Sequence, residues 1–275
     1  MAADLGGKGQ QKKWNTHNLS KRLGVDVACA AAAGGLVAPL ITVVDKCIIE
    51  NASGKRPMAE SIKASVTQLL FRPHRFLSSR AFLIILCVYG GTYTSANTVD
   101  TFKSTTKNRA ASATTSGISK FTATSATNLS LSLVKDSQFT KMFGTVSARP
   151  IPPASYALFM TRDALTIFAS FNLPSVVAPR LPISDDFAEK YMTRASAAQF
   201  LIPAAMQTVS TPLHLMGLDL YNRNGGTTLR ERLSKVGADW GKSTLARMAR
   251  IVPAFGIGGV VNNNLRRKLM EPLEK

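Results

Sequence analysis

The sequence has few acidic residues, few cysteines and none of the common catalytic motifs. Asp and Glu number 16 against 34 Lys and Arg, a formal net charge of +18. The three cysteines, Cys29, Cys47 and Cys87, form no CxxC pair, which argues against a zinc site or a disulfide framework and favours buried small side chains. No phosphate-binding glycine loop, zinc-ligand spacing or nucleophile elbow occurs, so we expect no enzymatic activity, metal or cofactor.

The excess of basic residues limits the class of partner. A basic protein can bind nucleic acid, anionic lipid or anionic small molecules. Nucleic-acid binders gather basic residues in runs with aromatics between them, whereas here they lie between apolar segments. We therefore expect membrane lipid and a small anionic metabolite as partners, and no nucleic acid. Residues 1–22 are polar and basic without the pattern of a signal or presequence, which predicts a solvated tail.

Apolar stretches provide the main fold signal, because about 20 apolar residues suffice to cross a bilayer. Small residues from Ala30 to Gly35 in the first stretch would let a neighbouring helix approach closely. A sixth helix is expected near residues 118–134, where Ser and Thr are frequent, with one face toward a polar cavity. The five clear stretches are residues 23–44, 81–102, 151–178, 196–221 and 244–264.

The loops between these stretches differ in charge. Residues 45–80 and 222–250 each hold seven basic residues, against three and two acidic ones, whereas residues 180–194 are balanced at three each. The positive-inside tendency places the two basic loops on the same, protein-synthesising side of the membrane.

One spacing recurs three times along the chain. Gly90, Pro153 and Pro253 are each followed ten positions later by Asp or Asn, and an aromatic residue lies two or three positions after each. Because Gly and Pro bend helices, three such copies indicate a threefold repeated membrane protein. We therefore predict an all-α protein with six transmembrane helices in three pseudo-symmetric pairs. Its expected helix kinks are Pro39, Gly90, Pro153, Pro212 and Pro253.

The repeat divides the chain into four parts. A tail of residues 1–22 precedes repeats at 23–108, 109–180 and 181–275, of which the second is short and degenerate.

These features resemble the mitochondrial carrier family, in which each even helix ends in an aromatic-acid-x-x-base motif. The match is complete at Asp100 and Lys103 and partial at Asp163 and at Arg266, which follows Asn263 by three positions. The Pro-acid-x-x-base motif of the odd helices fails, because Ile41 and His214 occupy its acidic positions. The chain therefore resembles a divergent, atypical member, of the kind found in fungi.

The resemblance implies a location in the mitochondrial inner membrane and favours it over the outer membrane. It also implies gates formed by ion pairs, with Asp100, Lys103, Asp163 and Arg266 as candidates, although Asp100 and Asp163 could instead be plain helix-end charges or pair with neighbours. Trp240, Lys242 and Ser243 resemble a family segment that opens a helix and binds the phosphate of cardiolipin.

Three arginines are the candidate substrate ligands. In the family the site lies just before the even-helix bend, which here points to Arg149, Arg250 and, one turn earlier, Arg247. A guanidinium suits carboxylate or phosphate, and an ionisable group in a membrane usually faces a cavity or a partner. Alternatively, Arg247 and Arg250 reach out to lipid headgroups. His214 either faces the cavity or is a hydrogen-bonded core residue, and Asp26 is either cavity-facing or near the surface.

Three functions remain open at this point. The first is a mitochondrial carrier-like transporter of a small anionic metabolite, working by alternating access. The loss of acidic residues at positions 41 and 214 supports a second, a non-transporting scaffold or membrane-morphology protein with a protein partner. A soluble basic binding protein is the third, if the apolar stretches are core helices.

Overall fold

The computed structural model describes residues 14–115, 117–146, 150–171, 173–184, 194–223 and 225–274. Within these ranges every regular element is a helix, so the predicted all-α class is confirmed. The elements are α1 (Leu19–Ala52), α2 (Met58–Phe71), α3 (Pro73–Leu77), α4 (Arg80–Thr106), α5 (Ile118–Phe143), α6 (Pro153–Phe171), α7 (Leu173–Val177), η1 (Ala178–Arg180), α9 (Arg194–Asn222), α10 (Leu229–Ala249), η2 (Val252–Gly258), α11 (Gly259–Met270) and η3 (Glu271–Leu273).

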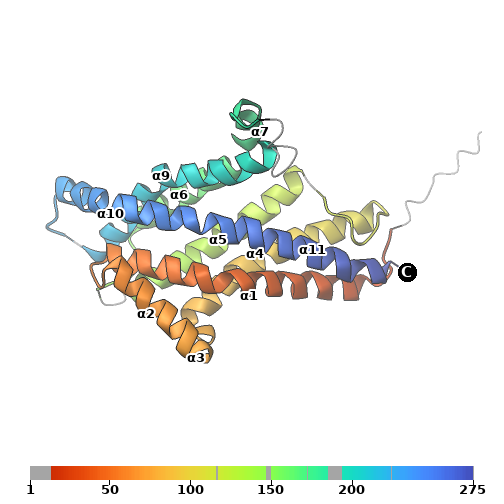
Figure 1. The fold of residues 1–275 in the computed structure, drawn as a ribbon, viewed down its shortest axis with the longest axis horizontal. Helices are drawn as coiled ribbons and strands as arrows, with labels where there is room; N and C mark the ends of the chain where they lie inside the picture. Colours follow the sequence, from red (N-terminus) through yellow and green to blue (C-terminus); the bar gives the residue numbers. More distant parts are fainter. Residues whose placement is uncertain are drawn as a thin grey trace, which may run out of the picture.

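The long helices form an elongated bundle (Figure 1). α1 packs against α4, and α9 packs against both α6 and α10. α11 lies beside α1, so the start of α1 and the C-terminus of the chain meet at one end of the molecule (Figure 1). The short helix α2 and the longer helix α10 both begin toward the opposite end (Figure 1), so parts of the two basic segments lie at the same end, and their side of the membrane stays a prediction.

The small residues of α1 allow a close contact between α1 and α4. A Cβ atom placed on Gly34 would lie only 2.9 Å from the backbone nitrogen of Gly90. Only glycine fits at such an approach, so the predicted role of this small-residue stretch in helix contact is confirmed. The contact fixes the crossing of the first two long helices.

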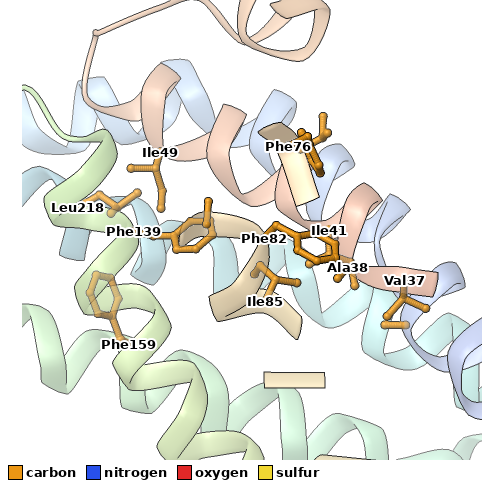
Figure 2. Packing of buried hydrophobic residues seen from close by; sticks show 13 residues of the cluster. Val37, Ala38, Ile41, Ile49, Phe76, Phe82, Ile85, Phe139, Phe159 and Leu218 are labelled. Atoms are coloured by element: carbon orange, nitrogen blue, oxygen red, sulfur yellow. The ribbon is translucent and has the colours of Figure 1, made fainter. Parts of the chain in front are cut away.

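A hydrophobic cluster fills the space between the helices next to this contact. Figure 2 shows Phe82 and Ile85 of α4 facing Ile41 of α1. Phe76 of α3 packs on Phe82 with ring centroids 6.1 Å apart. Phe139 of α5 belongs to the same cluster, which therefore anchors α5 to the first helix pair.

The predicted kinks have different outcomes. Pro39 and Gly90 lie inside α1 and α4, and Pro212 lies inside α9. Pro253 lies in η2, a π-helical segment, which suits a residue that lacks the N–H of a regular α-turn. The prediction of a kink at Pro153 is wrong, because this residue is the first of α6, where the missing N–H has no partner to lose.

The expected spans match helices, with changed boundaries. The polar stretch at residues 118–134 is helical and extends to Phe143 in α5. The last apolar stretch is divided among α10, η2 and α11, because α10 begins at Leu229, well before the apolar residues. Within the described ranges, α1 and α4 are the two helices long and apolar enough to cross a membrane. The six-span arrangement therefore stays a prediction, and so do the repeat boundaries.

Candidate functional site

A chain of buried ion pairs crosses the centre of the bundle. Asp45 of α1 binds Lys135 Nζ of α5 at 2.8 Å and Nη1 of Arg250, the residue that ends α10, at 2.7 Å. The side chains of Asp45 and Lys135 are 6% and 8% exposed, so water screens this pair little. One carboxylate thus connects three helices that are far apart in the sequence.

The chain of ion pairs continues through Asp136, the residue after Lys135. Lys135 Nζ lies 2.9 Å from Asp136 Oδ1, and Arg162 Nη2 of α6 lies 2.6 Å from Asp136 Oδ2. Arg162 Nε also donates to Asp163 Oδ1 at 2.9 Å. We call these six residues the central ion chain: Asp45, Lys135, Asp136, Arg162, Asp163 and Arg250.

His214 of α9 contacts this chain from the core side. Its Nδ1 lies 2.7 Å from Arg162 Nη1, and its ring packs near Phe159. Because a guanidinium only donates hydrogen bonds, Nδ1 accepts here and the ring is neutral with its proton on Nε2. Of the two alternatives for His214, the structure selects the buried, hydrogen-bonded core residue.

A largely enclosed cavity of about 100 Å³ lies beside the central ion chain. α1, α4, α5, α6 and η2 all contribute to its wall. Its charged lining includes Arg250 and Asp163, and its uncharged polar lining includes Thr92 and Asn128, which hydrogen-bond to each other at 3.2 Å. Asp163 Oδ2 is buried and has no hydrogen-bond partner within the described part of the chain. The residues that line the cavity therefore include a guanidinium, and a carboxylate with one buried oxygen that lacks a hydrogen-bond partner in the described part of the chain.

A second polar layer, here called the terminal layer, closes the end of the bundle that holds the start of α1. Asp26 of α1 binds Arg266 of α11 at 2.7 Å, and both side chains are fully buried. Thr101 of α4 donates to Asp26 Oδ2 at 2.5 Å and accepts from Arg266 Nη2 at 2.9 Å. Asn97 and Asn262 exchange a pair of amide hydrogen bonds beside them, at 2.9 and 2.8 Å. These contacts lock α1, α4 and α11 together.

Polar contacts also close the opposite end, and we call them the loop-end layer. Asn51 of α1 donates to Asp239 of α10 at 2.8 Å. Asp219 of α9 binds Arg232 of α10 at 2.6 Å. The central cavity therefore lies between two layers of polar contacts that join different helices.

The three predicted substrate ligands have separate locations. Arg250 lines the cavity, as a ligand would. Arg247 is buried between α9 and α10, where its Nε donates to Gln207 Oε1 at 3.0 Å, so it does not reach out to headgroups. Arg149 lies outside the described residues.

Asp100 and Asp163, two of the predicted gate residues, pair with neighbours, an alternative that the sequence left open. Asp100 binds Lys120 of α5 at 2.6 Å, Asp163 binds its chain neighbour Arg162, and Arg266 binds Asp26. Lys103 lies one turn beyond Asp100 on α4. Asp26 is therefore neither cavity-facing nor near the surface, because it forms the buried partner of Arg266.

The segment from Trp240 to Ser243 does not open a helix, contrary to the sequence-based expectation. Trp240, Lys242 and Ser243 all lie within α10, where backbone amides bond to carbonyls of the same helix. Trp240 Nε1 donates to the carbonyl of Thr208 at 2.9 Å, and Ser243 is fully buried. Lipid phosphate therefore has no free helix start to bind at this point.

Sequence reasoning missed two central residues, Lys135 and Asp136. The polar helix was expected to end at residue 134, one position before them. Adjacent opposite charges at the end of a Ser/Thr-rich helix are a signal that could have extended it, because buried charges in such helices are usually paired. Asp45 was missed because it was assigned to a loop, whereas α1 continues to Ala52.

Comparison with known proteins identifies the class. A family model described as a probable citrulline exporter matches residues 29–270. Since this range covers most of the chain, the protein belongs to that family. No curated protein matches the chain. The assignment is consistent with a membrane transport protein, the class predicted from the sequence.

The resemblance to the mitochondrial carrier family is wrong, because the family that matches is a different one. Glycine and proline bends followed by polar residues are common in packed membrane helices, so their spacing was not specific. The absence of an acidic residue at positions 41 and 214, which hold Ile41 and His214, was a more informative signal that the chain is not a mitochondrial carrier.

Proposed function

We propose that this protein exports citrulline, or a closely similar neutral α-amino acid, across a membrane by alternating access, with the central cavity as its substrate site. Citrulline at neutral pH carries one carboxylate, one ammonium and an uncharged ureido group. A site for it needs a cation, an anion and neutral hydrogen-bonding groups close together.

The observation that carries this proposal is that Arg250 and Asp163 both line the same cavity. A guanidinium binds carboxylate well, and the unsatisfied Oδ2 of Asp163 can accept hydrogen bonds from an ammonium group. Thr92 and Asn128 offer hydroxyl and amide groups of the kind that a ureido group binds. The arrangement suits a zwitterion better than the purely anionic metabolite expected from the arginines alone.

The cavity is smaller than the pockets that usually hold small molecules. Pockets that hold small molecules usually measure about 300–1,000 Å³, whereas this one measures about 100 Å³. The cavity must therefore widen to admit an amino acid. In our proposal the terminal layer and the loop-end layer open in alternation, and the six long helices span the membrane as three antiparallel pairs.

Flux of labelled citrulline from proteoliposomes tests this proposal. Hydrogen bonds to charged groups contribute about 1.5–3 kcal/mol, so Arg250→Gln and Asp163→Asn should each lower the efflux rate at low substrate by about 10- to 100-fold. Arg230→Gln is the matched control, because Arg230 is an exposed arginine at the start of α10, and Arg250 lies at the end of the same helix. Efflux at the rate of empty liposomes from a folded wild-type protein would refute export and favour the scaffold alternative.

The cellular location stays a prediction. The mitochondrial inner membrane and a contact with cardiolipin were inferred from the carrier resemblance, and membership of the exporter family supports neither of them. Fractionation of cells expressing the tagged chain would test the location, and an absence from mitochondria would leave the proposed export untouched.

A further inference from the structure

Arg247 is a buried cation without a carboxylate of its own. Its side chain is 2% exposed, and its contacts in the described part of the chain go to Gln207 Oε1 at 3.0 Å and Ser210 Oγ at 3.5 Å. Both partners are neutral. A guanidinium removed from water without a counter-ion is strongly unfavourable, so such a group usually has an anion beside it.

The carboxylates that act electrostatically on Arg247 do not supply this anion. Asp45 and Asp163 act on Arg247 across space, but Asp45 binds Lys135 and Arg250, and Asp163 binds Arg162. Counting Arg247 together with the central ion chain, four cations face three carboxylates. Among these seven described residues, the buried centre of the bundle therefore carries one positive charge in excess.

The surroundings of Arg247 contain hydroxyl groups that lack partners. Gln207, Ser210 and Thr211 share one face of α9, and Ser243, Thr244 and Arg247 share one face of α10. The hydrogen bond from Trp240 Nε1 to the carbonyl of Thr208 brings these two faces together. The hydroxyl oxygens of Thr211, Ser243 and Thr244 are buried without a hydrogen-bond partner in the structure as described.

We propose that the interface of α9 and α10 binds a small monovalent anion at Arg247, with the hydroxyls of Thr211, Ser243 and Thr244 as further donors. A hydroxyl donates readily to an anion, and a single negative charge would neutralise the excess at the centre of the bundle. The anion is either chloride from solution or the carboxylate of an amino acid bound apart from the central cavity, and the second case rests on the proposed function. Arg247 does not line the cavity that holds Arg250, so this is a separate site.

Thermal unfolding of the full chain in detergent tests the proposal without any substrate. The midpoint Tm is measured in sodium gluconate while chloride replaces gluconate at constant ionic strength. A ligand that binds the folded state stabilises it in proportion to the logarithm of its concentration, so Tm should rise by about 5 °C at a large excess of chloride. Arg247→Gln should abolish the rise, and Arg230→Gln, which changes an exposed arginine at the start of α10, should keep it.

Two further variants keep the test decisive if Arg247→Gln does not fold. Ser243→Ala and Thr244→Val each remove one hydroxyl donor and retain the charge of Arg247. Each should therefore raise, by about tenfold, the chloride concentration that gives half of the Tm increase. Unchanged chloride dependence in both variants would contradict the assignment of these hydroxyls.

A second arm distinguishes the source of the anion. If chloride has no effect, citrulline should raise Tm more in the wild type than in Arg247→Gln, because the variant keeps only the shift from the central cavity. The amine that lacks the carboxylate should give the same result in both proteins. That result would assign the anion to the substrate. Absence of a chloride effect together with a citrulline shift of equal size in the wild type and Arg247→Gln would overturn the proposal and leave the proposed export intact.

Discussion

Asp45 provides the sharpest test of the central ion chain, because it is the carboxylate that joins α1 to α5 and to the end of α10. Asp45→Asn keeps the size of the side chain and removes its charge, which leaves Arg250 without its 2.7 Å partner while Lys135 keeps Asp136. Removing one partner of a buried pair costs about 3–5 kcal/mol. For a chain of this length that corresponds to a fall in Tm of about 6–20 °C, measured by tryptophan fluorescence in detergent.

A double variant shows whether the loss comes from the unpaired charge. Asp45→Asn combined with Arg250→Gln removes both members of the pair, so it should recover about 1–3 kcal/mol relative to the sum of the single variants. Lys235→Gln is the control, because Lys235 forms a partly exposed pair with Asp239 and should change stability by less than about 1 kcal/mol. A negligible effect of Asp45→Asn, or strictly additive variants, would refute the central ion chain as a structural element.

Three further predictions concern the helix contacts and the terminal layer. Gly34→Leu should destabilise the protein by about 1–3 kcal/mol, because even a Cβ atom at this position would lie 2.9 Å from the backbone of α4. Gly35→Ala is the control: a Cβ atom there meets open space, so this variant should be neutral or slightly stabilising. Thermal unfolding compares the two variants. Maleimide should label Cys87 alone in the folded protein, because the other two cysteines are buried; mass spectrometry reads this, and rapid labelling of all three would contradict the packing. Replacing both Asn97 and Asn262 by cysteine should allow an oxidative cross-link that stops efflux until it is reduced; unimpaired efflux from the cross-linked protein would mean that the terminal layer does not open.

The sequence was sufficient to predict most of the helices. Apolar length predicted α1 and α4, and the helix at residue 118 was predicted at its observed start although Ser and Thr are frequent in it. The outcome at Pro153 differs because proline both bends helices and begins them, and local sequence does not separate the two uses.

The site was predicted only in part, because ion pairs depend on how the helices pack. Arg250, which was selected from its place before a bend, lines the cavity, and its role as a substrate ligand stays a prediction. Its partner Asp45 is 205 positions away in the chain, and the partner of Arg266, Asp26, is 240 positions away. No spacing rule along one helix connects residues so far apart, so the pairs became visible only in the folded bundle.

Labelled citrulline efflux from proteoliposomes is the measurement that tests the proposed export most directly. Wild-type protein and Arg230→Gln should release citrulline well above empty liposomes, while Asp163→Asn and Arg250→Gln should fall by about 10- to 100-fold. Equal release by all four proteins would show that the central cavity is not the substrate site. Release from none of them, with each protein demonstrably folded, would contradict export itself.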